Sequence, residues 1–212
     1  MAKLGVRTVD EMVGRTDLLK VKDTATSRRA SSLDLSGVLY NPYAKQKKAM
    51  IFDPKKVYNF ELEKTLDERV LVKQLLPALE KGQKRSIEVD VTNTDRTFGT
   101  IFGSEITRRY PEGLEEDSFV IKCSGAGGQS FGAFIPKGLT LELTGDSNDY
   151  FGKGLSGGKL VVYPPKGTTF KSDENIIIGN VAFYGATSGK AYDSGVAGER
   201  FCVRNSGVRA VV

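Results

Sequence analysis

The chain has 212 residues, of which 31 are Lys or Arg, 26 are Asp or Glu and 24 are Gly, and it contains no His and no Trp. This length suits one large domain or two modest ones. The absence of histidine excludes Ser/His/Asp and Cys/His catalysis, HExxH peptidases and zinc fingers. The two cysteines, Cys123 and Cys202, are too few for a Cys₄ zinc or iron–sulfur site. We therefore expect no catalytic, cofactor-binding or metal-binding residues of these kinds here, and any such chemistry must belong to another chain.

The net charge of +5 is unevenly distributed. Residues 1–85 carry 18 basic and 11 acidic side chains, whereas residues 86–212 carry 13 and 15. The basic excess lies in an N-terminal group and not along an aromatic or glycine-rich face, so we expect no nucleic-acid partner. That group contains Arg28, Arg29, Lys45, Lys47 and Lys48.

No apolar stretch approaches the ~20 residues of a membrane span, and the N-terminus has no hydrophobic signal core. We therefore expect no membrane partner. The expected location is the cytoplasm, or a plastid if the protein comes from a photosynthetic eukaryote.

Residues 1–64 are expected to form an N-terminal helix followed by an extended connector. Residues 8–11, Thr-Val-Asp-Glu, have the spacing of a capping box and predict the start of a short helix. Polar residues then dominate from Lys20 to Ser32, and no hydrophobic period holds as far as Pro54. Such a segment is typical of a connector that lies on another surface.

Residues 65–122 are expected to form an α/β entry segment. A second capping box at 65–68 predicts a helix that ends near Gly82, and Pro77 should kink it. The strict alternation of residues 87–91 predicts a strand with one buried face. A further helix over 99–110 and a strand over 119–122 are expected to follow.

Residues 123–212 hold 17 of the 24 glycines and are expected to form glycine-rich coils. Short apolar runs recur between the glycines and predict strands. These runs cover residues 139–143, 159–163, 176–178, 181–184, 190–192, 201–203 and 210–212. Glycines three or four residues apart introduce several of them, which makes an imperfect repeat of roughly 20 to 30 residues.

Short strands that alternate with glycine corners favour a parallel β-helix, because only glycine takes a positive φ without strain at the bends. The expected corners are Gly128, Gly132, Gly154, Gly158, Gly185, Gly189, Gly195 and Gly198. An antiparallel sandwich with glycine-rich hairpins is the alternative. The Asn-Gly and Asp-Gly dipeptides of tight hairpins are missing from this region, which disfavours that alternative.

Two other patterns give weak signals for a ligand. Residues 125–130 resemble a dinucleotide-binding loop, but Ser130 replaces the third glycine and residues 131–136 do not predict the required helix. We interpret this segment as a corner between strands. Glu142, Asp146 and Asp149 lack the spacing of an EF-hand and are interpreted as solvated turn residues.

Several short sequence motifs together resemble the C-terminal GXGXG domain of the glutamate synthase large subunit. They are FGAF (131–134), GDSNDY (145–150), GKGLSGGK (152–159), GN (179–180), YGATSG (184–189) and GERFCVRNSG (198–207). The resemblance extends upstream through residues 7–15, 65–82, 93–96 and 107–110, so that it covers nearly the whole chain.

This resemblance implies a mainly β fold, namely a right-handed parallel β-helix with a single-stranded solenoid architecture. It implies that the chain is a non-catalytic, structural part of an oxidoreductase that makes glutamate from glutamine and 2-oxoglutarate during ammonia assimilation. The implied partners are the amidotransferase and FMN-binding synthase domains, which the β-helix positions. FMN and an iron–sulfur cluster are expected in the rest of the enzyme and not in this chain.

In the family that the chain resembles, the β-helix continues through further coils. The resemblance therefore predicts that this chain is truncated at its C-terminus, as a fragment or a split gene product, with possible self-association through the open last coil. The alternative is a stand-alone β-helix assembly subunit, like the related subunit of formylmethanofuran dehydrogenase.

Overall fold

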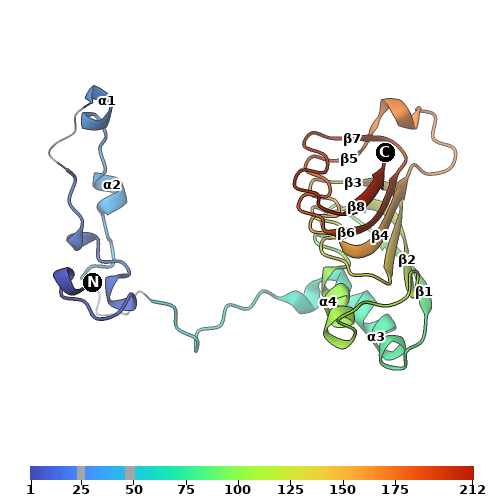
Figure 1. Ribbon diagram of the computed structural model, residues 1–212, viewed down its shortest axis with the longest axis horizontal. Helices are drawn as coiled ribbons and strands as arrows, with labels where there is room; N and C mark the ends of the chain where they lie inside the picture. Colours follow the sequence, from blue (N-terminus) through green and yellow to red (C-terminus); the bar gives the residue numbers. More distant parts are fainter. Residues whose placement is uncertain (23–26, 46–50) are drawn as a thin grey trace. The chain divides into compact units, whose positions relative to one another are not determined.

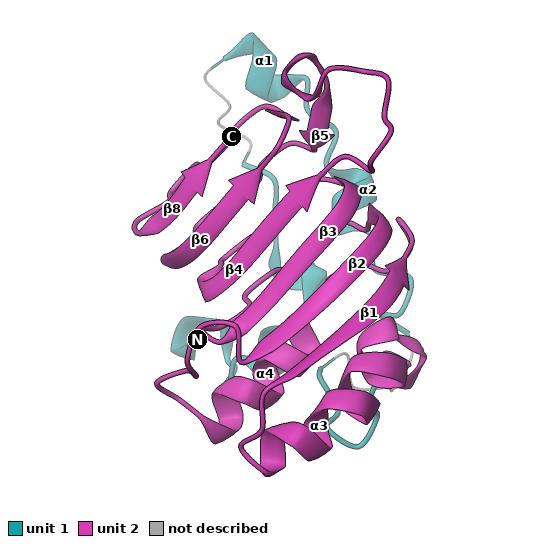
Figure 2. Cartoon of the chain, turned by 90° about the vertical axis from the view of Figure 1, so that its right-hand side faces the viewer, with its two compact units in different colours: residues 1–59 teal, residues 60–212 magenta. Residues whose placement is uncertain are grey.

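A computed structural model of the chain contains two compact units, residues 1–59 and residues 60–212, which Figure 2 draws in different colours. The structure describes residues 1–22, 27–45 and 51–212. Each unit is described by itself below.

The first unit consists of short helical turns joined by extended chain. They are η1 (Ala2–Leu4), η2 (Asp10–Met12), η3 (Thr16–Leu18), α1 (Arg28–Ser31) and α2 (Ser36–Leu39). At the expected capping box, the Glu11 amide donates to Thr8 Oγ1 at 3.2 Å and the Arg7 amide donates to Glu11 Oε2 at 2.8 Å. The helix that follows is a single 3₁₀ turn, η2.

The first unit has little core of its own. Among its described residues, Val6 is the one buried apolar side chain. Arg28, Arg29 and Lys45 of the expected basic group are exposed, whereas Lys47 and Lys48 lie outside the described residues.

The helices of the second unit precede or flank its sheet. They are η4 (Leu62–Lys64), the π-helical η5 (Asp67–Val72), α3 (Lys73–Glu80), α4 (Thr100–Arg109) and η6 (Ser172–Glu174). The predicted helix over 65–82 therefore forms as two segments. Pro77 lies inside α3, one turn after the π-helical segment ends. Proline lacks an N–H group and crowds the carbonyl four residues earlier, so the hydrogen bonding of the helix is expected to be irregular just before Pro77.

Asp67 joins η5 to α4. Its buried carboxylate accepts hydrogen bonds from the amides of Gly99 and Ile101, both at 2.8 Å, and so binds free N–H groups at the start of α4. Burial raises the pKa of Asp67 to about 6, although these hydrogen bonds favour the ionised form.

Eight strands form one parallel sheet in the second unit (Figure 1). They are β1 (Arg85–Val91), β2 (Phe119–Gly127), β3 (Leu139–Ser147), β4 (Ser156–Tyr163), β5 (Ile176–Ile178), β6 (Ser188–Asp193), β7 (Val196–Ala197) and β8 (Val208–Val211). The order is β1-β2-β3-β4-β6-β8, and the short β5 pairs with β3 and β7. Every pair of these strands is parallel, which excludes the antiparallel sandwich.

The expectation of a mainly β fold is wrong as a description of this chain. Strands hold a minority of the residues, and helices pack on the first strands in an α/β arrangement. Phe102 of α4, for example, meets Phe119 of β2 edge to face, with ring centroids 5.2 Å apart.

Two predicted strands, over 181–184 and 201–203, are also wrong, because both segments are turns. The backbone φ is +63° at Val181, +57° at Phe183 and +56° at Cys202. A β-strand requires a negative φ, so these apolar runs cannot extend. The last strand, β8, covers Val208–Val211, which partly overlaps the expected 210–212.

Candidate functional site

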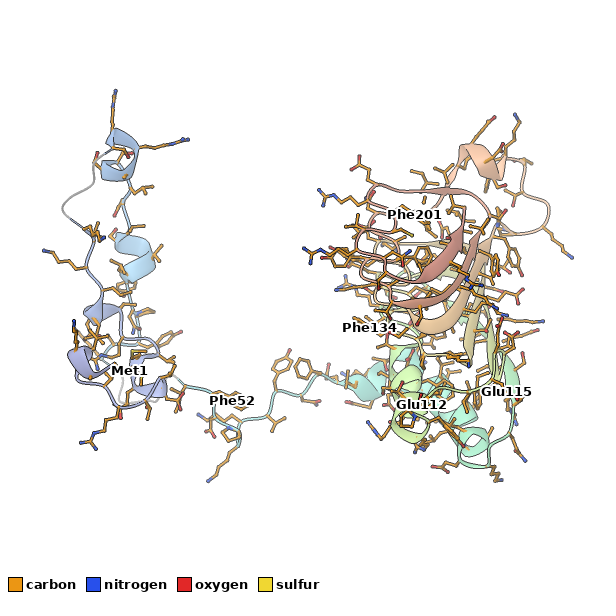
Figure 3. The ribbon with its side chains drawn as sticks, viewed as in Figure 1. Met1, Phe52, Glu112, Glu115, Phe134 and Phe201 are labelled. Carbon is orange, nitrogen blue, oxygen red and sulfur yellow. The ribbon has the colours of Figure 1, made fainter. Side chains whose placement is uncertain are left out.

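Four turns of similar shape lie one above another beside the sheet, and we call them the turn stack (Figure 1). The turn stack consists of residues 129–134, 149–154, 180–185 and 199–204. In Figure 3, Phe134 is labelled on this side of the unit.

Each turn of the stack has left-handed backbone at three alternate residues. The twelve residues are Ser130, Gly132, Phe134, Tyr150, Gly152, Gly154, Val181, Phe183, Gly185, Arg200, Cys202 and Arg204, with φ between +56° and +69°. The alternate glycines of the sequence, Gly152 and Gly154 above all, therefore coincide with alternate left-handed positions. A left-handed residue other than glycine costs roughly 1–2 kcal/mol, so eight of the twelve positions need support from the surrounding structure.

Backbone hydrogen bonds between successive turns supply this support. The amide of the first left-handed residue donates to the next turn, as from Tyr150 to the Asn180 carbonyl at 2.9 Å. The middle amide donates to the preceding turn, as from Phe183 to the Phe151 carbonyl at 2.7 Å. The third amide again donates forward, as from Gly154 to Tyr184 at 2.8 Å. Because the pattern repeats, each turn holds its neighbours in register.

A column of phenylalanine rings packs beneath the turns. Successive ring centroids lie 5.4 to 5.9 Å apart in the order Phe98, Phe131, Phe151, Phe183 and Phe201. The first two contacts are stacked and the last two are edge to face, both of which are favourable geometries for aromatic pairs. The first four rings are fully buried. The column therefore joins all four turns into one apolar core.

The eight glycines predicted as corners differ in backbone conformation. Gly132, Gly154, Gly185 and Gly189 have left-handed φ values of +69°, +62°, +64° and +116°, and Gly195 is close to extended at +158°. Gly128, Gly158 and Gly198 do not have a positive φ, so the expected reason for glycine fails there. A Cβ at Gly158 would lie 2.6 Å from Ile135 Cγ1, and close approach is thus the reason for that glycine.

We expect valine at Gly189 to destabilise the chain by about 3 kcal/mol. Its φ is unfavourable for an L residue, and a Cβ would lie 2.5 Å from the Gly158 carbonyl oxygen. Gly185→Val is the matched control, because Gly185 has φ +64° and open space around its Cβ position. Urea unfolding should show a loss at residue 185 of about half the loss at residue 189. Equal losses would contradict a role for the close approach.

A column of cations lies on the outer face of the sheet. Lys159 of β4, Lys190 of β6 and Arg209 of β8 are paired in register, and we call them the cation column. Lys159 Nζ lies 2.7 Å from Asp117 and 3.0 Å from Glu116 Oε1. The other oxygen of Glu116 lies 2.6 Å from Lys190 Nζ. These lysines lower the pKa values of Glu116 and Asp117, chiefly through hydrogen bonds.

Asp193 is the anomalous polar group of the interior. It is 6% exposed, and neither carboxylate oxygen has a hydrogen-bond partner among the described residues. It ends β6 opposite Val162 of β4. Burial raises the pKa of Asp193 to about 7. Burial, and then the charge of Asp193, raises the pKa of the Cys202 thiol.

The remaining candidate groups form no further site. Glu142 accepts a hydrogen bond from the Tyr163 hydroxyl, and Asp149 Oδ1 accepts one from the Asn180 amide, while Asp146 is exposed. Within residues 1–22, 27–45 and 51–212, no cluster of three or more His, Cys, Asp or Glu side chains could hold a metal ion. In the same ranges, no helix is long and apolar enough to cross a membrane.

Sequence reasoning missed the phenylalanine column, the cation column and Asp193. The sequence did contain a signal that Asp193 is buried, because side chains alternate along β6 and Asp193 lies on the same face as buried Ala191. The cation column carries no local signal, since its members are 31 and 19 positions apart and only the strand register aligns them.

A family model described as the GXGXG motif matches residues 67–212. The whole chain is 51% identical to the glutamate synthase [NADPH] large chain of Bacillus subtilis and 48% identical to glutamate synthase [NADH] of Schizosaccharomyces pombe. It is 33% identical to the chloroplastic ferredoxin-dependent glutamate synthase of Spinacia oleracea. The chain spans 14%, 10% and 13% of the lengths of these three relatives.

Proposed function

The chain belongs to the GXGXG family, and from this premise we propose that it is a structural part of a glutamate synthase. In this role it positions the glutaminase domain and the synthase domain, which convert glutamine and 2-oxoglutarate into glutamate. The observation that carries the proposal is the turn stack, in which hydrogen bonds and buried rings join every turn to the next.

We further propose that residues 119–212 form coils of a right-handed parallel β-helix. Each coil would contain one strand of the main sheet and one turn of the stack. The parallel register from β2 through β8 and the hydrogen bonds between turns support this reading. Repeated coils bury their apolar faces only on one another, which makes the unit stiff along its axis.

The chemistry of the proposed enzyme is assigned to other domains. An iron–sulfur cluster normally takes four thiolates, and the two cysteines here do not fit one. Cys123 is a buried residue of β2, and burial raises its pKa, which opposes the thiolate form that binds metals. FMN and the cluster are therefore proposed to lie outside this chain, in a part of the enzyme that shares a cytoplasmic or plastid location.

The test is the coupling of the two half-reactions in the complete enzyme that carries this chain. Phe151→Ala should loosen the turn stack and raise the ratio of glutamine hydrolysed to glutamate formed at least twofold. Glutamine hydrolysis alone should persist, because its catalytic groups lie elsewhere. Phe134→Ala, which removes a half-exposed ring from the same stack, is the control. An unchanged ratio in a measurably destabilised Phe151 variant would refute the positioning role.

The rival proposal is a stand-alone β-helix assembly subunit. It predicts separate neighbouring genes, whereas the positioning role predicts amidotransferase and FMN-domain coding sequence immediately upstream and in frame. Identities of 51%, 48% and 33% to three glutamate synthases across the whole chain favour a place within a glutamate synthase over the stand-alone subunit.

A further inference from the structure

The cation column is only partly neutralised. Neighbouring strands lie about 4.8 Å apart, so Lys159, Lys190 and Arg209 form a row of like charges at close spacing. Glu116 and Asp117 neutralise the first two members. No described acidic side chain lies within ion-pair distance of Arg209, which is exposed. Glu116 thus lies beside Lys159 and Lys190, whereas no described carboxylate lies in the same way beside Arg209.

These cations line a cavity. Its volume is about 430 Å³, and its lining includes the three members of the column together with Lys137 and the carboxylates of Glu112 and Glu116. With Asp117, which pairs with Lys159 beside the cavity, four cations thus face three carboxylates. This volume lies within the usual range for small-molecule sites.

Glycines form part of the lining of the cavity. Gly158 and Gly189 lie in the strands β4 and β6 that carry Lys159 and Lys190, and both line the cavity. A Cβ at Gly158 would meet Ile135, and a Cβ at Gly189 would meet the Gly158 carbonyl oxygen, so both would point into the interior. The charged side chains, and not the glycines, therefore give the cavity its chemistry.

We propose that this cavity binds a small oxyanion, a phosphate or carboxylate group, between Lys190 and Arg209. The planar guanidinium of Arg209 suits two oxygens of such a group, and Lys190 adds a point charge. Lys190 is shared with Glu116, so the bound anion competes with that carboxylate. A cavity favours a free small molecule over an acidic protein segment, which would need a flatter face. This inference does not depend on the proposed role in glutamate synthase.

The test is an NMR titration of the 212-residue chain with inorganic phosphate and, in parallel, with malonate. Chloride at matched ionic strength is the reference. We expect saturable shifts of the Gly189 and Arg209 amides with a Kd on the order of 1 mM, the weak end of specific binding. The two probes separate a phosphate ligand from a carboxylate ligand.

Three variants distinguish specific anion binding from a nonspecific charge effect, because each is expected to change the affinity differently. Arg209→Gln should weaken binding at least fivefold. Arg85→Gln should not change it, because Arg85 is an exposed arginine on β1, at the opposite edge of the sheet. Glu116→Gln should strengthen binding about threefold by releasing Lys190.

Circular dichroism would establish that each variant keeps the fold before its titration is interpreted. Equal shifts with chloride, or an Arg209→Gln variant that binds as well as the parent chain, would overturn the proposal. Binding of acidic peptides without binding of either small anion would overturn it too.

Discussion

Replacing Asp193 with asparagine is expected to stabilise the chain at pH 8 by about 2–3 kcal/mol. The carboxyl group is buried without a hydrogen-bond partner, and burial raises its pKa from 3.8 to about 7. At pH 8 the folded chain must therefore hold an unpaired buried charge, whereas the unfolded chain holds the same charge in water. Asparagine removes the charge and keeps the shape.

The sign of the pH dependence follows from the raised pKa. Between the unfolded value of 3.8 and the folded value of about 7, the folded chain binds the proton and the unfolded chain does not. The stability that Asp193 contributes is thus present below pH 4 and is lost as the pH rises through 7. One pKa unit corresponds to about 1.4 kcal/mol, so the loss between pH 5 and pH 8 is about 3 kcal/mol.

Urea unfolding of the parent chain and the variant at pH 5, 6, 7 and 8 would measure this difference. The two stability curves should diverge as the pH rises. Asp146→Asn is the matched control, because Asp146 is an exposed aspartate near the end of β3. If the curves of the parent chain and the Asp193 variant stay parallel, the Asp193 carboxyl group of the parent chain does not titrate in an apolar interior.

The regular elements could be predicted from the sequence because their signals are local. The alternation of residues 87–91 predicts a strand with one buried face, and β1 forms there. The helix expected over 99–110 also forms, as α4, with Phe102 and Ile106 buried. Five of the short glycine-bounded runs also coincide with strands in whole or in part, since apolar β-branched runs favour extended chain.

The turn stack could not be predicted in the same way. Val181 is β-branched, a type that favours strands, and it nevertheless has left-handed backbone. Its conformation depends on the hydrogen bond from its amide to Glu199, which belongs to the next turn. Local propensity is therefore overridden by a contact 18 residues away, and a reading of the run 181–184 alone predicts the wrong element.

The glycines show a related limit. Gly185 and Gly158 look alike in the sequence, as members of the same repeat. Gly185 has a left-handed φ and open space, while Gly158 has ordinary backbone and a tight contact with Ile135. Which of the two reasons applies depends on how each glycine packs against neighbouring strands and turns. Glycine spacing alone therefore does not say what each glycine does, and Gly158 and Gly189 lie within strands.

The largest loss of stability is expected for Phe151→Ala, at about 3–5 kcal/mol. Phe151 is fully buried, stacked on Phe131 at 5.9 Å and edge to face with Phe183 at 5.6 Å. Removing the ring loses its buried area and leaves a cavity in the middle of the column. Because repeated units are stabilised by their neighbours, the turns on both sides should weaken together.

Phe134→Ala separates this effect from the mere loss of an aromatic ring in the turn stack. Phe134 also has left-handed backbone, but its side chain is 53% exposed, and its removal should cost less than about 1 kcal/mol. Hydrogen exchange would then show where the chain opens. In the Phe151 variant, protection should fall at the amides of Gly152, Phe183 and Cys202, which bond from turn to turn, and persist in β1 and α4. Loss of protection confined to residues 149–154 would show that the turns are held individually, and the proposed stiffness of the stack would then be wrong.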